Sequence, residues 1–179
     1  MDPFFYKLPF RLLDNETENL IVEKAMENPS EFFAYKGQIS GKEDGNYIFV
    51  RGFLRELESV QKLMKSCTVE CYPLVMRQYP NTLGPIHIDN PNGRNCVIIS
   101  PLIPKVNYVP THFWESFDST VPIATADFSD GMPTLINTQR LHNITNNSSL
   151  RMNFQLCFTD DFSVIKKLII EDRLFKKVF

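Results

Sequence analysis

The first part of the chain mixes strand-like and helix-like patterns of apolar residues. Residues 4–13 and the short apolar run at 47–50 predict strands. Apolar residues at helical spacing predict helices over residues 15–27 and 53–66. Asp14 or Asn15 is a typical N-cap for the first helix, and Glu18 stands where a capping-box partner of Asn15 would be.

Beyond about Cys67 the apolar pattern changes to a period of two or to short continuous runs. Turn-forming clusters rich in Asn, Gly and Ser separate these runs, so each run predicts a short strand. The predicted strands cover residues 69–78, 95–103, 111–115, 121–126, 134–137 and 152–158. Many short strands at such spacing favour a sandwich or barrel. Residues 162–179 predict a terminal helix, either packed on the barrel or available to a partner.

Length and composition describe an ordinary globular chain. The 179 residues are 43% apolar and 22% charged, with a net charge of -2 and a pI near 5.9. One domain with a sizeable core is expected. The charge balance disfavours binding to nucleic acid. We find neither a signal-peptide core nor an apolar run long enough for a membrane span, and we expect a cytoplasmic protein. The four cysteines do not have zinc-site spacing and are expected to be reduced, mostly buried thiols.

Two of the three histidines form the strongest chemical pattern. His87 and Asp89 form an H-x-D motif, and residues i and i+2 of a strand point to the same face. His142 is a better third ligand than His112, because it follows a predicted strand and is itself followed by Arg151. Two histidines and one carboxylate leave three coordination positions open, as non-heme Fe(II) oxygenases require. Alone, H-x-D is a weak signal that also fits a surface turn.

Arg151 strengthens this interpretation, because it lies nine residues after His142 at the start of the apolar run RMNFQLCF. A buried charge is costly without a partner. A guanidinium can grip a carboxylate with two parallel hydrogen bonds. If iron chelates the keto-acid end of 2-oxoglutarate, Arg151 is a candidate to hold the far carboxylate.

The neighbouring residues resemble a known family. The run YPNTLGPIHIDNPNG is similar to the prolyl 4-hydroxylase branch of the 2-oxoglutarate dioxygenases, which includes the oxygen-sensing prolyl hydroxylases. The segment PTLINTQRLHNITNNSSLRMNF also resembles the strands that carry the distal histidine and the arginine in that family. The resemblance covers roughly residues 69–160.

The resemblance implies a fold and a set of cofactors. The fold would be α+β but mainly β, a double-stranded β-helix (a jelly-roll or cupin-like barrel) with N-terminal supporting helices and a C-terminal helix. Within a single domain, 1–179, it implies a supporting segment (1–68), a core (69–160) and a terminal helix (161–179). The cofactors would be Fe(II), 2-oxoglutarate and O₂, with ascorbate as a supporting reductant. No side chain is assigned as an acid or base.

Further site residues follow from the resemblance, each with an ordinary alternative. Tyr79 would hydrogen-bond the same 2-oxoglutarate carboxylate as Arg151, or be a barrel-core aromatic. Asn153 is a weaker cofactor-binding candidate. Four residues are candidates for contact with substrate, although surface or core roles are common for such residues: Arg77, Arg94, His112 and Trp114.

Two departures from the family pattern leave the substrate open. Ser100-Pro101-Leu102 stands where the oxygen-sensing enzymes carry tyrosines, and their glycine pair is missing before the next strand. A peptidyl, prolyl-like substrate is the leading hypothesis. The alternatives are a small-molecule oxygenase, a nucleic-acid-base oxygenase and a non-catalytic β-barrel binding module. A turn at Asn146-Asn147 would place His142 opposite Arg151 in one sheet, whereas the family fold puts their strands in facing sheets.

Overall fold

The computed structural model describes residues 3–27, 33–34, 47–50, 52–80, 84–89, 93–144 and 149–176. Its larger sheet is antiparallel, with the described strands in the order β1-β8-β5-β10-β4-β3-β2. These strands are β1 (Phe5–Lys7), β2 (Phe33–Ala34), β3 (Tyr47–Val50), β4 (Cys71–Gln78), β5 (Cys96–Ile103), β8 (Thr134–Asn137) and β10 (Arg151–Phe158).

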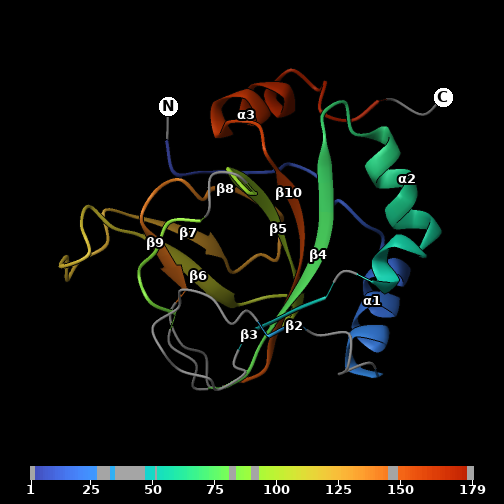
Figure 1. The fold of residues 1–179 in the computed structure, drawn as a ribbon, viewed down its shortest axis with the longest axis horizontal. Helices are drawn as coiled ribbons and strands as arrows, with labels where there is room; N and C mark the ends of the chain where they lie inside the picture. Colours follow the sequence, from blue (N-terminus) through green and yellow to red (C-terminus); the bar gives the residue numbers. More distant parts are fainter. Residues whose placement is uncertain are drawn as a thin grey trace.

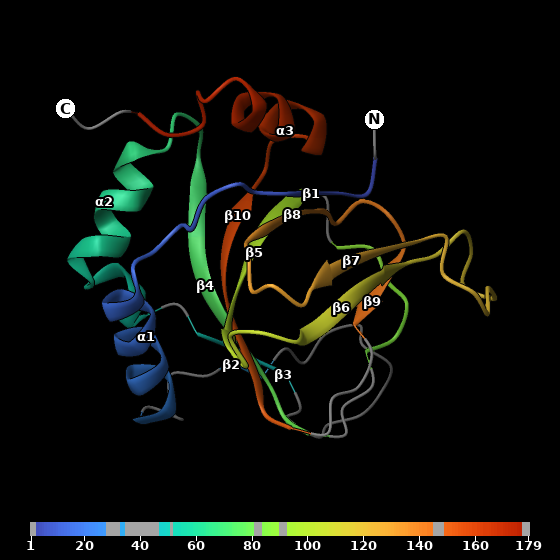
Figure 2. The same ribbon diagram turned by 180° about the vertical axis from the view of Figure 1, so that it is seen from behind.

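A smaller antiparallel sheet has the order β7-β6-β9. Its described strands are β6 (Tyr108–Phe113), β7 (Ala124–Phe128) and β9 (His142–Ile144). An isolated antiparallel bridge joins His87 to His142 and so extends this sheet beyond β9. Figures 1 and 2 show the smaller sheet on one side of β4, β5 and β10, and helices α1 and α2 on the other. The arrangement is mainly β and consistent with a jelly roll.

The helices cover the outer face of the larger sheet. They are α1 (Asn15–Glu27), the 3-10 turn η2 (Phe53–Arg55), α2 (Glu58–Ser66) and α3 (Phe162–Ile170). Asp14 caps α1, since its Oδ1 accepts a hydrogen bond from the Thr17 amide at 2.7 Å. Glu18 does not act as a capping-box partner: it is fully buried, with Lys105 Nζ 3.0 Å away. No helix in the described ranges is long and apolar enough to cross a membrane.

Strand β10 separates two apolar clusters, because alternate residues of a strand point to opposite faces. Phe154, Leu156 and Phe158 pack into the cluster shared with the helices. Cys157 faces the other way, into a cluster with Phe113 of β6 and Phe128 of β7. Each fully buried side chain of this size contributes about 1.5–3 kcal/mol to folding. The space between the two sheets is therefore a second core that also contains polar positions of β10.

Several boundaries differ from the sequence-based expectation. Strand β1 is far shorter than residues 4–13, and the helix expected over 53–66 is divided into η2 and α2. Residues 1–68 do more than support the core, because β1, β2 and β3 join the larger sheet. Strand β7 begins only at Ala124, and Val121 before it is 72% exposed. The tail helix ends at Ile170, after which Asp172 adopts a φ of 53°.

Strand β8 is observed at the predicted residues 134–137, and β4, β5 and β10 lie within two residues of the expected bounds. The strand predicted over 111–115 is observed earlier, as β6. The cysteines are free thiols; Cys67, Cys96 and Cys157 are buried and Cys71 is partly buried. This agrees with the expected reduced, mostly buried state.

Candidate metal and carboxylate site

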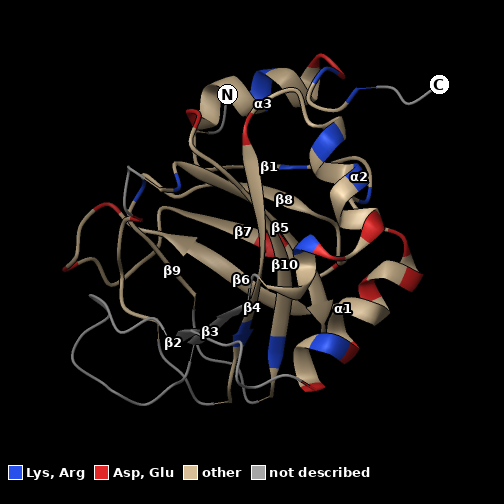
Figure 3. Ribbon diagram, turned by 45° about the vertical axis from the view of Figure 1, so that its right-hand side comes forward, with Lys and Arg blue, Asp and Glu red and all other residues tan. Residues whose placement is uncertain are grey.

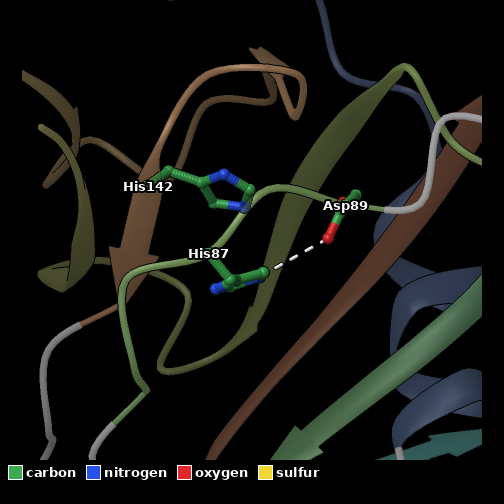
Figure 4. A group of neighbouring side chains, drawn as sticks. All are labelled: His87, Asp89 and His142. Carbon is green, nitrogen blue, oxygen red and sulfur yellow. Dashed lines mark ion pairs between the residues drawn. The ribbon is translucent and has the colours of Figure 1, made fainter. Parts of the chain in front are cut away.

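His87, Asp89 and His142 lie together at the edge of the smaller sheet. Each offers one ligand atom, and these atoms lie within 4.8 Å of one another. Figure 4 shows the three side chains converging from two separate segments of the chain, with His87 Nε2 3.4 Å from Asp89 Oδ1. The backbones of the two histidines exchange hydrogen bonds of 2.9 Å in both directions. Strand pairing therefore fixes the distance between two of the three candidate ligands.

Both imidazole rings are oriented by backbone carbonyls. Nδ1 of His87 is 2.9 Å from the carbonyl oxygen of Pro85, and Nδ1 of His142 is 2.8 Å from that of Arg140. A carbonyl only accepts, so each Nδ1 carries the hydrogen in these contacts. In a neutral ring, Nε2 is then left with its lone pair, which is the form that binds a metal. His142 is thus oriented in the tautomer that a metal binds, whereas the 3.4 Å contact of His87 Nε2 with Asp89 Oδ1 requires a hydrogen on that nitrogen, which a metal ion would replace.

Electrostatics favour the metal-binding protonation states. Burial, with a smaller effect of neighbouring His87, lowers the pKa of His142 to about 4 and keeps its ring neutral near pH 7. Burial by itself would raise the pKa of Asp89. The contact with His87 and the charge of Arg94 outweigh burial and hold that pKa well below its usual range. The site therefore presents a carboxylate and a neutral His142.

Arg94 is an ion-pair partner of the candidate ligand Asp89. Its Nε donates to Asp89 Oδ2 at 2.6 Å, and its Nη1 donates to Gln155 Oε1 at 2.7 Å. The side chain is only 20% exposed. Arg94, which the sequence suggested as a candidate for contact with substrate, lies beside the candidate ligand Asp89 and also lines the cavity between the two sheets.

Arg151 lies on the facing sheet and is fully buried. Figure 3 shows the strands mostly free of charged residues, which makes a charge inside β10 unusual. Nη1 of Arg151 donates to Gln78 Oε1 at 2.9 Å, and the guanidinium carbon lies 4.3 Å from the centre of the Tyr108 ring. Within the described chain, Nε and Nη2 have no hydrogen-bond partner. Two buried, unpaired donors of a cation suit an anionic ligand.

Tyr108 and Asn153 complete the surroundings of Arg151. Asn153 Nδ2 donates to the Tyr108 hydroxyl, and Asn153 Oδ1 is buried without a partner among the described residues. Burial raises the pKa of Tyr108, so its hydroxyl keeps its proton and can itself donate. Sequence analysis named Asn153 but missed Tyr108.

A cavity between the two sheets reaches the candidate metal cluster, but its described lining does not include Arg151, Tyr108 or Asn153. It is bounded by the three candidate metal ligands, by Arg94 and Gln155, and by mostly apolar side chains of both sheets. The other lining residues are Met76, Gly84, Pro85, Val97, Ile99, Thr111, Ile136, Thr138 and Ile144. Gln155, Asn153 and Arg151 occupy alternate positions of β10 and so share the face that borders the cavity.

The structure does not bring Tyr79 to Arg151. Tyr79 follows β4, is 38% exposed, and receives a 2.5 Å hydrogen bond from Arg77 Nη2. Arg77 is not at the cavity either: it is buried on the opposite face, where its Nη1 donates to the carbonyl oxygen of Ala25 at 3.3 Å. The reason is strand parity, because Gln78 is paired with Arg151 and its neighbour Arg77 must point the other way.

His112 and Trp114 also lie apart from the described lining of the cavity. His112 Nδ1 is 3.0 Å from Thr125 Oγ1, and Trp114 Nε1 donates to Asn143 Oδ1 at 2.9 Å. Both flank Phe113, which is buried between the sheets, so their side chains are directed to the outer face of the smaller sheet. A contact between these residues and a substrate would occur outside the cavity.

His142 and Arg151 belong to facing sheets and are not paired in one sheet. Of the two arrangements that the sequence left open, the structure therefore favours the one with the two strands in facing sheets. The turn at Asn146-Asn147 on which the first arrangement depended lies outside the described residues.

Solved structures of similar fold are all of low sequence identity. An oxidoreductase of the 2OG-Fe(II) oxygenase family from Burkholderia pseudomallei matches with a TM-score of 0.54 and 10% identity, covering 88% of this chain and 85% of that chain. A prolyl hydroxylase from Trichoplax adhaerens, solved in complex with a hypoxia inducible factor peptide fragment, matches with a TM-score of 0.57 and 15% identity, covering 87% and 83%. No family model and no curated protein matches the sequence.

A third match is the viral collagen prolyl hydroxylase of Paramecium Bursaria Chlorella virus-1, solved with 2-oxoglutarate. Its TM-score is 0.54 at 12% identity, and the match covers 86% of this chain and 94% of that chain. At such identities the likeness concerns the fold. The fold of this chain is thus similar to that of 2OG-Fe(II) oxygenases, including prolyl hydroxylases.

Proposed function

We propose that this chain is an Fe(II)- and 2-oxoglutarate-dependent oxygenase with the metal held by His87, Asp89 and His142. The observation that carries the proposal is the presence, beside this cluster's sheet, of a facing sheet in which Arg151 is fully buried with two guanidinium nitrogens that have no hydrogen-bond partner among the described residues. A 2-oxo acid with a second carboxylate is the ligand that would use both the metal cluster and the guanidinium of Arg151. The resemblance of the H-x-D region to prolyl 4-hydroxylases supports the same conclusion.

The donor set fits iron better than a structural ion. Two imidazole nitrogens and one carboxylate are a facial set that leaves three positions open for ligands. Structural ions are usually enclosed by protein donors, which this cluster does not provide among the described residues. When bound, Fe(II) would supply oxygen activation coupled to the conversion of 2-oxoglutarate to succinate and CO₂, with hydroxylation of a substrate C–H bond.

The protein's own residues would bind and orient 2-oxoglutarate and would exclude water from the site. Arg151 would hold the far carboxylate of 2-oxoglutarate, with Tyr108 and Asn153 as neighbouring polar groups. The apolar lining between the sheets would keep water from the reacting atoms. We propose that the two sheets form a double-stranded β-helix, that residues 1–179 are one domain, and that no side chain acts as an acid or base.

Anaerobic titration with Fe(II) and 2-oxoglutarate tests the proposal. We expect a weak visible metal-to-ligand charge-transfer band, which His142→Ala should abolish because it removes one of three ligands. Circular dichroism checks that the His142→Ala variant is folded. A well-folded wild-type protein that never gives the band would refute the proposal and favour a β-barrel binding module.

We propose a peptidyl, prolyl-like residue as the substrate. The support is the resemblance of HIDNPNG to the prolyl hydroxylase branch, and the peptide bound in the Trichoplax adhaerens structure. Proline-rich peptides incubated with the iron-loaded protein, 2-oxoglutarate and O₂ should gain one oxygen atom, about 16 Da by mass spectrometry, if this is correct. Release of succinate stimulated only by small molecules would instead favour the small-molecule alternative. The net charge of -2 gives a nucleic-acid substrate no support.

A further inference from the structure

We infer that Arg94 is a positioning residue that restricts Asp89 to one metal bond and so keeps a coordination position open for oxygen. The inference rests on the proposed metal site. Its starting point is the division of the Asp89 carboxylate: Oδ1 lies on the side of His87 Nε2, whereas Oδ2 is held by Arg94 Nε at 2.6 Å. A metal at the cluster can share Oδ1 without a rival, but must displace a guanidinium to reach Oδ2.

The number of bonds from Asp89 to the metal decides how many coordination positions remain free for other ligands. With one bond from each ligand, about three of six octahedral positions are free, enough for a chelating 2-oxo acid and O₂. If Asp89 bound through both oxygens, about two would remain, and the 2-oxo acid would fill them. A charge-assisted hydrogen bond of this length is among the stronger polar contacts in proteins, so it can compete with a second carboxylate bond.

The contact is built into the fold. The Arg94 carbonyl oxygen accepts hydrogen bonds from Thr138 Oγ1 at 2.9 Å and Gln139 Nε2 at 3.1 Å. The same two residues hold the Asp89 backbone, through Asp89 N to Thr138 O at 3.0 Å and Gln139 Nε2 to Asp89 O at 3.3 Å. One turn after β8 therefore fixes both partners of the ion pair. The far end of the Arg94 side chain is fixed separately.

Gln155 provides that second attachment, accepting from Arg94 Nη1 at 2.7 Å. Gln155 is on the same face of β10 as Arg151, four positions further along the strand. The guanidinium is therefore held between a metal ligand and the strand that carries the proposed 2-oxoglutarate carboxylate site. An arginine that only neutralised Asp89 would not require this second attachment.

The test counts water molecules bound to Mn(II) in the metal-loaded full chain, without 2-oxoglutarate, from the broadening of the Mn(II) electron paramagnetic resonance lines in ¹⁷O-water. We expect about three waters in the wild type and about two in Arg94→Gln, because the freed Oδ2 replaces one. Arg94→Lys, which retains a cationic donor, should restore the count. Arg55→Gln removes an exposed arginine elsewhere and should match the wild type.

The outcomes separate this inference from the proposed function. A wild-type protein that binds no Mn(II) contradicts the proposed metal site itself. A wild type that binds Mn(II) with fewer than about three waters, or an Arg94→Gln protein that keeps all of them, overturns the role of Arg94 and leaves the metal site standing. A low wild-type count would still overturn the inference even if Arg94→Gln does not fold.

Discussion

Replacing Arg151 by Met should have different effects on stability and on binding. Among the described residues Arg151 has two buried donors without a hydrogen-bond partner, and each such donor costs about 1–3 kcal/mol. Met removes that cost but also loses the hydrogen bond to Gln78 and the contact with the Tyr108 ring, worth together about 2–5 kcal/mol. The two contributions are of similar size, so the free energy of unfolding of the metal-free variant should lie between about 3 kcal/mol below and about 4 kcal/mol above the wild-type value.

Binding of 2-oxoglutarate should fall steeply in the same variant. Loss of one partner of a buried, hydrogen-bonded charge pair costs about 2–5 kcal/mol. That corresponds to a dissociation constant higher by about 30-fold to several thousand-fold. The affinity for Mn(II) should be unchanged, because Arg151 contacts none of the three candidate ligands in the described structure.

The assay combines urea denaturation of the metal-free protein with anaerobic calorimetric titration of 2-oxoglutarate into the Mn(II)-loaded protein. Arg55→Met is the matched control, since it removes an exposed arginine that lies before α2. Suppose that Arg151→Met lowers the free energy of unfolding by more than about 3 kcal/mol and binds 2-oxoglutarate within about threefold of wild type. Arg151 would then be a structural residue, and the reasoning would be wrong.

Two further predictions concern stability. The pKa of His142 is about 4 in the folded protein and near 6.5 when unfolded, so the unfolded chain takes up the proton first as pH falls. The metal-free protein should thus lose roughly 3 kcal/mol between pH 6.5 and 4, measured by denaturation at several pH values, and His142→Phe should flatten that decline. Gly131 has a φ of 70°, and a Cβ there would lie 2.0 Å from the Lys105 carbonyl oxygen. Gly131→Ala should cost more than about 2 kcal/mol in thermal denaturation, whereas Gly52→Ala, at a φ of -52°, should be tolerated; equal effects would contradict the geometry.

The sequence predicted the elements whose apolar runs are long and sharply bounded. Strands β4, β5 and β10 are of this kind, as is α1 with its cap at Asp14. Strand β9 was not predicted, because it has only three residues and two of them are polar. Its partner His87 belongs to no strand at all and pairs through a single bridge. Such pairing depends on neighbours distant in the sequence, which no local pattern contains.

The candidate site was predictable where its residues are close in the sequence, although His87 and Asp89 do not lie in a strand as the i, i+2 argument assumed. H-x-D placed His87 and Asp89 together because they are two residues apart. Tyr108 was not predicted, because its position against Arg151 depends on tertiary packing between strands that are distant in the sequence. The ion pair of Arg94 with Asp89 was not predicted, because a spacing of five residues outside a helix does not fix where two side chains point.

Strand β10 has one face that packs against the helices and one that borders the cavity. The register of β10 against its neighbouring strands therefore decides which side chains face the cavity. A slip by one residue against β4 and β5 would exchange the two faces. Phe154 and Leu156 would then enter the cavity, while Arg151 and Gln155 would be forced among apolar side chains. A misregistered chain would therefore be both unstable and inactive. Selection for a working site and selection for correct strand alignment act here on the same residues.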